Sequence, residues 1–275
     1  MEKITFLKRK AVEIRKSLIE MIYEAGTGHT GSSLSNTDIL TALYYSVMKV
    51  DPRNPAWEER DRYIQSKGHA VESYWAVLAD KGFFPKEELK TFSSFNSRLI
   101  GHPNNKVPGV EMNTGALGHG LSISVGMALA AKLDNKAYRV FTLMGDGELA
   151  EGSVWEAAMA ASQYQLDNLI GIIDRNRLQI TGNTCDVMNN EPLDKKWESF
   201  GWDVVEVNGH DFAELTEALN VTTANGKPTM VIANTIKGKG ISLAENVAGW
   251  HHHVPSKEEY DLAMKELSEQ LEVLS

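Results

Sequence analysis

Two polar motifs follow short apolar runs of the chain, and their residue types suit a metal ion. The tripeptide Gly-Asp-Gly at 145–147 follows one run, and Asn176 follows the next. If the runs are neighbouring parallel strands, the Asp146 carboxylate, the Asn176 side-chain oxygen and a backbone carbonyl near Leu178 meet at one point. These are three hard oxygen ligands, to which a diphosphate can add two. Such a set suits Mg²⁺, with Ca²⁺ or Mn²⁺ as substitutes. Gly-Asp-Gly alone is common turn chemistry, so the prediction depends on its pairing with Asn176.

Glycine-histidine pairs form a second group of candidates. Five of the eight histidines follow a glycine: His29, His69, His102, His119 and His210. Such pairs are typical of loops, where a lone histidine is more often solvated or structural. Several at strand and helix ends instead indicate a polar pocket for proton transfer and phosphate contact. His210 precedes Asp211, which we expect to cap a helix, so we interpret His210 as structural.

Two further motifs lie toward the end of the chain. The turn Lys-Gly-Lys-Gly at 237–240 follows an apolar run. It is either a solvated basic turn or a place where the ammonium of Lys237 lies beside a phosphate. Three consecutive histidines, 251–253, follow Trp250, and the internal position excludes a purification tag. Of the three, His251 is the functional candidate.

The overall charge restricts the partners. The 275 residues have a formal net charge of −9, which argues against nucleic acid and against a membrane surface, since both reward clustered Lys and Arg. A phosphorylated ligand of an acidic protein needs helix N-termini, Gly-rich backbone or a divalent cation. The single cysteine, Cys185, excludes an internal disulfide, and the N-terminus lacks the apolar segment of a signal peptide. We therefore expect a cytoplasmic protein.

The elements that must position these residues follow from hydrophobic periodicity. Short β-prone runs between helical patterns predict an α/β fold, a twisted parallel sheet with helices on both faces. Ligands of such a sheet bind at the carboxyl ends of the strands, where the motifs lie. The expected strands are 62–66, 139–144, 169–174, 202–207 and 229–235, and the expected helices are 6–25, 37–48, 71–81, 121–132, 153–164 and 212–224. Ser35 or Asn36 would cap the second helix, and a capping box of Ser256 and Glu259 would open a last one.

Five motifs resemble the N-terminal, diphosphate-binding module of transketolases, and they occur in transketolase order along nearly the whole chain. They are GTGHTGSS at 26–33, SKGHA at 66–70, TGALGHG at 114–120, KGKG at 237–240 and Trp250-His251. The Gly-Asp-Gly motif with Asn176 resembles the wider thiamin diphosphate superfamily. The resemblance implies the thiamin-diphosphate-binding fold, the PP module, formed by residues 1–275 as a single domain. A C-terminal helical extension would span about 256–273.

The resemblance also implies a role for each matching residue. Thiamin diphosphate would be the cofactor, and its metal would be held by Asp146, Asn176 and the Leu178 carbonyl. His29, His102 and His251 would face the sugar and move protons as the carbon–carbon bond breaks and forms. Glu151 would lie near a subunit interface, and His119 stands where transketolases often have Gln, which leaves its role open. The residues implied to contact the cofactor are Ser32, His69, Gly115, Ala116, Leu117, Gly147, Asn176, Lys237 and His251.

Transketolases are more than twice as long as this chain, and their second module contains the glutamate that protonates the aminopyrimidine ring of the cofactor. A chain that holds only the diphosphate end cannot set the ring tautomer on which activation of the cofactor depends. The resemblance therefore implies a split enzyme. A second subunit with the Pyr module and the C-terminal domain would complete it, in an α₂β₂ assembly.

The implied reaction transfers a two-carbon ketol unit from a ketose phosphate to an aldose phosphate. A split transketolase specialised for a sugar-catabolic pathway, acting on apulose 4-phosphate or a sulfosugar, is an alternative of the same class. A non-catalytic, thiamin-diphosphate-binding regulatory module is an alternative of a different class. Such a module needs no sugar-facing histidines, and their presence in this chain favours catalysis. A deoxyxylulose phosphate synthase is disfavoured, because those enzymes are normally one long chain. A nicotinamide-binding protein is excluded because no Gly-x-Gly-x-x-Gly opens a helix after the first strand.

Overall fold

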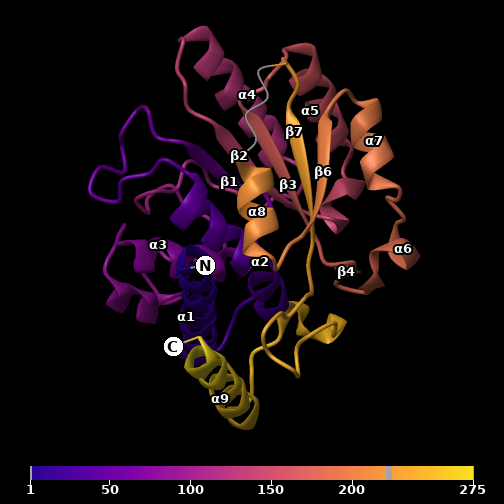
Figure 1. The fold of residues 1–275 in the computed structure, drawn as a ribbon. Helices are drawn as coiled ribbons and strands as arrows, with labels where there is room; N and C mark the ends of the chain where they lie inside the picture. The colour runs from indigo at the N-terminus through magenta and orange to yellow at the C-terminus, as the bar shows by residue number, and fades with distance from the viewer. Residues whose placement is uncertain (1, 221–224, 275) are drawn as a thin grey trace.

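A five-stranded parallel sheet forms the centre of the chain in the computed structural model, which describes residues 2–220 and 225–274 (Figure 1). The strands lie in the order β1-β2-β3-β7-β6. They are β1 (Arg62–Gln65), β2 (Val140–Gly145), β3 (Leu169–Arg175), β6 (Asp203–Asn208) and β7 (Thr229–Asn234). Every expected strand is present, with each end within one residue of its predicted position. The predicted parallel α/β fold is thereby confirmed.

Side chains along the central strands alternate between two apolar cores, one on each face of the sheet. On β2, Phe141 and Leu143 belong to one core, whereas Val140 and Met144 belong to the other. Because both faces are buried, the strands are continuous apolar runs, as is usual in parallel sheets. Removal of this apolar surface from water is the main stabilising contribution to the fold.

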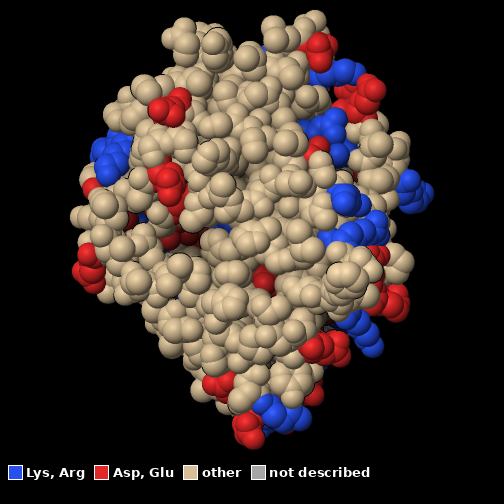
Figure 2. All heavy atoms as spheres, turned by 180° about the vertical axis from the view of Figure 1, so that it is seen from behind, with Lys and Arg blue, Asp and Glu red and all other residues tan. Residues whose placement is uncertain are grey.

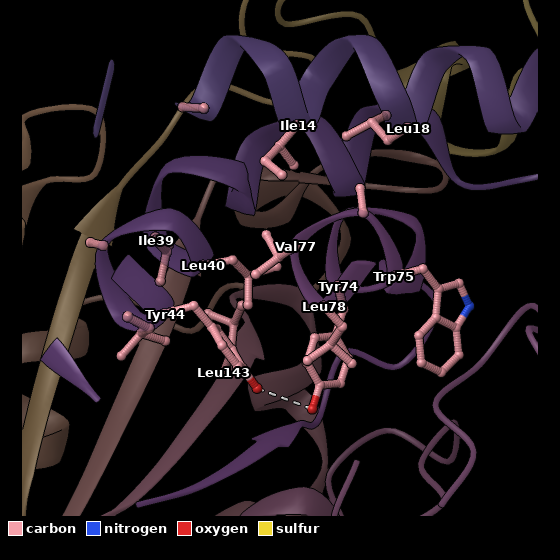
Figure 3. Close-up of a cluster of buried hydrophobic side chains, with 14 of the residues drawn as sticks. Ile14, Leu18, Ile39, Leu40, Tyr44, Tyr74, Trp75, Val77, Leu78 and Leu143 are labelled. Atoms are coloured by element: carbon pink, nitrogen blue, oxygen red, sulfur yellow. Dashed lines mark hydrogen bonds between the residues drawn. The ribbon is translucent and has the colours of Figure 1, made fainter. Parts of the chain in front are cut away.

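Helices cover both faces of the sheet (Figure 1). The core around Phe141 is closed by α1 (Glu2–Ala25), α2 (Thr30–Ala42), α3 (Val71–Lys81), α8 (Phe212–Leu219) and α9 (Lys257–Val273). Within it the Tyr44 hydroxyl donates to the Tyr74 hydroxyl at 3.2 Å, amid apolar side chains (Figure 3). The other core is closed by α4 (Gly120–Leu133), α5 (Gly152–Gln163) and α7 (Leu193–Ser199). Helices α1 and α9, from opposite ends of the chain, pack together through stacked Tyr23 and Tyr260 rings 4.2 Å apart.

The predicted start of the second helix is wrong. Helix α2 begins at Thr30 with His29 as its N-cap and continues from Leu43 to Val47 as the π-helical segment η1. Ser35 and Asn36 are therefore interior helix residues and not caps. Their polar groups form hydrogen bonds to residues on other elements. The Ser35 hydroxyl donates to Asp174 at 2.6 Å, and the Asn36 amide oxygen accepts from Ser73 at 2.7 Å. Buried partners on other elements make these polar residues compatible with a helix interior.

The predicted caps of the last two helices are present. Asp211 caps α8 by accepting from the N–H groups of Ala213 and Glu214, and the capping box of Ser256 and Glu259 opens α9. Helix α1 begins at Glu2, earlier than the predicted start at residue 6. Helix α8 ends at Leu219, and residues 221–224 of the predicted helix 212–224 lie outside the described residues. Within the described ranges, no helix is long and apolar enough to cross a membrane. The short elements that the sequence did not predict are η2 (Lys86–Thr91), η3 (Gly147–Ala150), β4 (Leu178–Gln179), β5 (Gly182–Asn183), α6 (Thr184–Val187), α7 (Leu193–Ser199) and η4 (Ala248–His252).

Candidate functional site

A cavity of about 470 Å³ lies at the carboxyl ends of β2 and β3. Its lining comes from segments that are far apart in the sequence, because several loops at this edge of the sheet contribute to it, each with between one and five residues. The predicted site residues that line it are His29, Ser32, His69, Gly115, Leu117, Asp146, Gly147, Asn176, Leu178, Lys237 and His251. Sequence reasoning therefore located most of this cavity before its geometry was known.

The Asp146 carboxylate lies at the turn after β2, where backbone N–H groups hold both of its oxygens. Its Oδ1 accepts from Gly147 N at 2.9 Å, and its Oδ2 accepts from Arg177 N at 2.6 Å. Burial and the nearby Asp174 carboxylate raise the pKa of Asp146 to about 6. A cation placed beside Asp146 would favour its ionised form, since an opposite charge counters both effects.

Asn176 and the Leu178 carbonyl face the same part of the cavity. The Asn176 amide is oriented at both ends: Nδ2 donates to Asp174 at 3.3 Å, and Oδ1 accepts from Leu178 N at 3.1 Å. Arg177 between them has φ +63°, a left-handed conformation that forms the turn. The Leu178 carbonyl accepts from Lys237 Nζ at 3.2 Å. This carbonyl is therefore already next to a positive charge.

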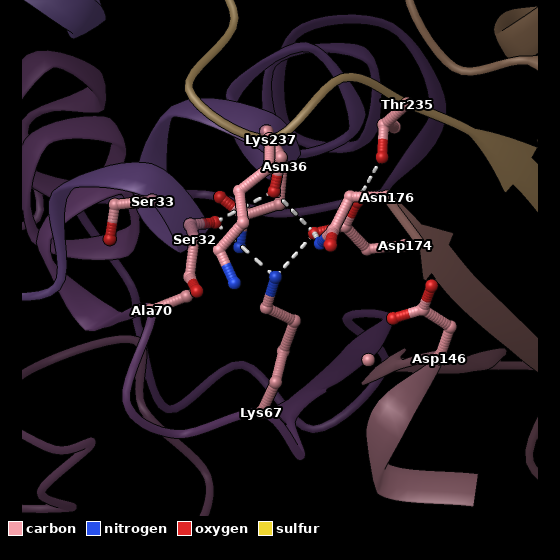
Figure 4. Close-up of polar contacts among 12 residues, drawn as sticks. Ser32, Ser33, Asn36, Lys67, Ala70, Asp146, Asp174, Asn176, Thr235 and Lys237 are labelled. Carbon is pink, nitrogen blue, oxygen red and sulfur yellow. Dashed lines mark hydrogen bonds and ion pairs between the residues drawn. The ribbon is translucent and has the colours of Figure 1, made fainter. Parts of the chain in front are cut away.

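Asp174 is the buried centre of the polar network under the cavity (Figure 4). Its carboxylate accepts from Lys67, Ser35 and Thr235. Burial alone would raise the pKa of Asp174, but the Lys67 ammonium and the hydroxyl donors outweigh burial and hold it below its usual range. Removal of one member of such a buried pair leaves an uncompensated charge, which is strongly destabilising.

Two lysines bring positive charge to the cavity. Lys67 and Lys237 line it, and each is 1% exposed. Burial and the neighbouring Lys67 charge lower the pKa of Lys237 to about 8. Lys237 also contacts His251 Nδ1 at 2.8 Å. Lys67 is compensated by Asp174, whereas Lys237 contacts the Leu178 carbonyl and His251. A polyanion in the cavity would offset the charge of Lys237.

Glu148, in η3, joins three of the loops that form the cavity. Its carboxylate accepts from Gly118 N at 2.9 Å, from Gly145 N at 3.0 Å and from the Ser66 hydroxyl. Burial raises the pKa of Glu148 above its usual range. The contacts fix the loops around 66, 118 and 145 relative to one another and shape the cavity between them.

Five histidine rings form a cluster, and three of them, His29, His69 and His251, line the cavity. His29 is the central one, with ring centroids 5.3 Å from His69, 5.6 Å from His251 and 6.4 Å from His102. The His69 and His251 rings are stacked at 5.1 Å. His252 also joins the cluster, 4.6 Å from His29. The sequence separates these residues by up to 223 positions, and the fold brings them together.

Four of the clustered histidines, His29, His69, His102 and His251, are held neutral. Burial, with the neighbouring His252, His102 and lysine charges, lowers the pKa of His29 to about 4. Burial and the Lys237 charge lower the pKa of His251 to about 3, and burial also lowers the pKa values of His69 and His102. A neutral imidazole has one nitrogen that donates a hydrogen bond and one that accepts, so each ring can both donate to a ligand and accept a proton from it.

Some predicted residues lie beside the cavity and not in its wall. His102 and Ala116 do not line it, although the His102 ring lies 3.0 Å from the position that a Cβ at Gly115 would take. Gly115 has φ +156°, so a glycine at this point allows its loop to approach His102. Glu151, expected near a subunit interface, is exposed at the N-terminus of α5. His119 is exposed and contacts its own loop through Leu117 O at 3.0 Å.

His210 has the structural position that its sequence context predicted. With Arg15 and Asp38 it forms a buried group that we call the loop anchor. His210 Nδ1 donates to Asp38 at 2.6 Å, and its Nε2 accepts from Ile236 N at 2.8 Å. Arg15 pairs with Asp38 at 2.8 Å and donates to Lys239 O at 2.9 Å. The loop anchor thus fixes the turn 236–240 through hydrogen bonds to the backbone of Ile236 and Lys239. This turn places Lys237 in the cavity.

Sequence reasoning missed several residues of the site. Lys67, Glu148, Gln179, Ile180 and Thr181 also line the cavity. A signal for Lys67 was available, since it lies within the SKGHA motif between Ser66 and His69. Asp174 and Glu72 lie behind the wall, and only the contacts made in the folded chain reveal them.

The residues present fit a divalent cation bound together with an anionic ligand. Among residues 2–220 and 225–274, no group of three or more His, Cys, Asp and Glu side chains could hold a metal. The available set is one carboxylate, one amide oxygen and one carbonyl, from Asp146, Asn176 and Leu178. These are hard oxygen donors, and a phosphorylated ligand would have to complete the shell, as is usual for Mg²⁺.

Comparisons with known proteins agree with this geometry. Residues 7–269 match the family described as the transketolase, thiamine diphosphate binding domain. The chain is 49% identical to an apulose-4-phosphate transketolase subunit of Phocaeicola vulgatus, over 98% of this chain and 96% of that protein. It is 43% identical to a 6-deoxy-6-sulfo-D-fructose transketolase subunit of a Clostridium species, over 96% of this chain and 97% of that protein. The solved transketolase of Campylobacter jejuni superimposes with a TM-score of 0.90 at 34% identity, over 95% of this chain but 42% of that longer one.

Proposed function

Since the chain belongs to the transketolase family, as a thiamine diphosphate-binding domain, we propose that it is the cofactor-binding subunit of a split transketolase. The reaction is the transfer of a two-carbon ketol unit from a ketose phosphate to an aldose phosphate. The observation that supports it best is the cavity itself. It combines Asp146 and Asn176, suited to a metal-bound diphosphate, with the sugar-facing histidines, His29 and His251, in one wall.

Thiamin diphosphate would bind with its diphosphate toward Asp146, and Mg²⁺ would be held by Asp146, Asn176 Oδ1 and the Leu178 carbonyl. Ca²⁺ or Mn²⁺ could replace Mg²⁺, since the donors are hard oxygens. Lys67 and Lys237 would offset the remaining phosphate charge. The bound cofactor supplies a carbanion-stabilising centre. The remaining cofactor contacts would come from Ser32, His69, Gly115, Ala116, Leu117, Gly147 and His251.

The histidines of this chain would bind and orient the sugar. His29, His102 and His251 are the proposed proton carriers at its hydroxyl groups, and burial keeps the pKa of His29 and His251 below neutrality, at about 4 and about 3. Each ring can therefore accept a proton from a hydroxyl and return it without first losing one to water.

A second subunit is part of the proposal. The chain covers 42% of the C. jejuni transketolase, and the relatives from P. vulgatus and Clostridium, which are about as long as this chain, carry subunit names. Phe95, Ile180 and Met188 are exposed apolar side chains, and Ile180 lines the cavity. Seen from behind, much of the central surface is uncharged, with Lys, Arg, Asp and Glu mostly toward the rim (Figure 2). We propose that residues 1–275 act as one unit that pairs with a Pyr-module subunit, as α₂β₂.

The substrate could be a specialised sugar. Apulose 4-phosphate and a sulfosugar are the candidates, because relatives at 49% and 43% identity are named for these sugars. A cytoplasmic location stays a prediction that rests on the single cysteine, Cys185.

The decisive experiment is co-purification of the chain with the product of the neighbouring gene. The complex, with thiamin diphosphate and Mg²⁺, would be assayed with ordinary ketose phosphates, apulose 4-phosphate and sulfofructose as donors. We expect ketol transfer by the complex and none by either polypeptide without the other. Activity of the isolated chain would contradict the split-enzyme proposal. Cofactor binding by the complex without transfer from any donor would favour the regulatory alternative.

A further inference from the structure

One fully buried carboxyl group lies directly behind His29. Glu72, in the first turn of α3, is 0% exposed and does not line the cavity. Its Oε1 accepts from the backbone N–H of His29 at 2.8 Å and lies 4.0 Å from His29 Nδ1. Its Oε2 accepts from the Ser33 hydroxyl at 2.6 Å. Glu72 therefore contacts both His29 and the first turn of the helix that His29 caps.

The approach of Glu72 to His29 is built into the backbone. A Cβ at Gly28 would lie 2.9 Å from Glu72 Oε1 and 2.7 Å from an Ile22 side-chain carbon, and Gly28 has φ +152°. Only glycine is compatible with that space and that conformation. The absence of a side chain at Gly28 thus allows the Glu72 carboxyl group to contact His29.

Glu72 has no strong cation to neutralise it. Among residues 2–220 and 225–274, His29 is the only basic side chain that forms an ion pair with Glu72 within 4.0 Å. A buried carboxylate without a paired Lys or Arg is costly, and the group responds by binding a proton more tightly. Burial raises the pKa of Glu72 to about 7, although the Ser33 and His29 donors partly oppose it.

We propose that Glu72 is a positioning residue that orients His29 and sets its proton affinity, so that the ring can exchange a proton beside the sugar. The part of this proposal that involves the sugar rests on the proposed function. The coupling of Glu72 to His29 does not depend on it, because both residues lie in this chain. The other titratable groups around His29 come from several loops and all disfavour its protonation. They are Lys67, His69, His102, Lys237, His251 and His252.

The direction of the coupling follows from charge. An ionised Glu72 stabilises the imidazolium form of His29, and a protonated Glu72 does not. At 4.0 Å, opposite unit charges change a proton affinity by about fivefold even in water, and by more where the pair is buried. The proton affinity of His29 therefore changes with each proton that Glu72 gains or loses.

The first test is an NMR titration of the free chain, with the His29 ring assigned by its loss in His29→Asn. We expect the ring signal to show a step with its midpoint near the Glu72 pKa of about 7. Glu72→Gln keeps an acceptor for the His29 N–H but removes the charge, so it should abolish the step. Glu111→Gln is the matched control, since Glu111 is a largely buried glutamate paired with Arg60 and Arg62, and it should keep the step.

A second variant keeps the test valid if Glu72→Gln folds poorly. Ser33→Ala removes the hydroxyl that stabilises the Glu72 carboxylate, so the step should move to higher pH. A step that persists unchanged in Glu72→Gln or in Ser33→Ala would overturn the proposal, and so would the absence of any step in the unmodified chain.

The second test uses the complex with its partner, thiamin diphosphate and Mg²⁺. Glu72→Gln should lower kcat/KM for the sugar by about tenfold or more, within the range of general acid–base effects, and should remove a pH dependence near neutrality. The Kd for the cofactor should stay within about twofold, because Glu72 does not line the cavity. An unchanged pH profile would overturn the proposal. Intact coupling in a complex that transfers no ketol unit would contradict the proposed function alone.

Discussion

Histidines occupy two contrasting regions of this molecule, although members of both follow a glycine in the sequence. In the cavity, His29, His69 and His251 face one another and two lysines, without a carboxylate in hydrogen-bond contact with any of their rings among the described residues. In the loop anchor, His210 is held between Asp38 and the Ile236 N–H. A histidine whose two nitrogens are both engaged by the protein has no capacity left for a ligand. The histidines in the cavity keep ring nitrogens available to a ligand, although their burial near positive charge is unfavourable.

The largest expected effects come from substitution of one aspartate in each region, Asp38 in the loop anchor and Asp146 in the cavity. Asp38→Ala leaves Arg15 buried without its partner, and both are 4% exposed. Unfolding free energy should fall by about 3–5 kcal/mol. Asp146→Ala should instead weaken Mg²⁺-dependent cofactor binding, on the order of 100-fold or more, with little loss of stability.

Urea denaturation and calorimetric titration at limiting Mg²⁺ would measure these two effects. Asp186→Ala, at an exposed carboxylate on α6, serves as the control for both. If cofactor binding by Asp146→Ala equals that of the unmodified chain, the proposed metal site is wrong.

The histidines provide the next comparison. His251→Asn should reduce kcat/KM of the complex by about 10²–10⁴-fold, as loss of an acid–base group does, and should leave the unfolding free energy within roughly 0.5 kcal/mol. His210→Gln should cost about 1–3 kcal/mol of stability because the Asp38 and Ile236 contacts lose their partner. The converse pattern, with His251 decisive for folding and His210 for the reaction, would refute the distinction between the regions.

The last comparison concerns the pH dependence of stability. Below pH 6.5 the histidines of the unfolded chain bind protons, whereas the pKa values of about 4 for His29 and about 3 for His251 keep these rings neutral in the fold. At these two rings the unfolded state then binds more protons, so they lower stability as the pH drops from 7 to 5, whereas the raised pKa values of Glu72 and Asp146 act in the opposite direction. The pKa of Asp38 is lowered by Arg15 against the effect of burial, so its contribution is lost only at more acidic pH.

A double variant, His29→Asn with His251→Asn, should therefore show a shallower fall between pH 7 and 5 in urea titrations. Identical slopes for the double variant and the unmodified chain would mean that the cavity rings are not held neutral.

Local signals predicted the strands and the Asp146–Asn176 part of the cavity, whereas the resemblance to transketolases predicted most of its other residues. Asp146 and Asn176 stand at the ends of apolar runs, and adjacent parallel strands must bring such ends together. The strand order was not accessible in the same way. Strand β7 lies between β3 and β6, so Thr235 reaches Asp174 across a crossover that residue spacing does not reveal.

The start of α2 and the role of Glu72 could not be predicted for a related reason. Ser35 and Asn36 have the residue types of helix caps, and only their buried partners on β3 and α3 show that they are interior. Glu72 stands in an ordinary helical pattern at the start of α3. Its contact with His29 joins residues 43 positions apart, and neither position carries a local signal for the pairing.

The dispersed origin of the cavity has a consequence for the lifetime of the protein. Its lining runs from His29 near one end of the chain to His251 near the other, through several intervening loops and turns. A ligand in this cavity would contact several separate segments, so opening of any one of them would weaken its binding. Occupancy should thus slow proteolysis of these segments together and not of one loop alone. The cellular abundance of the protein would then follow the supply of its cofactor.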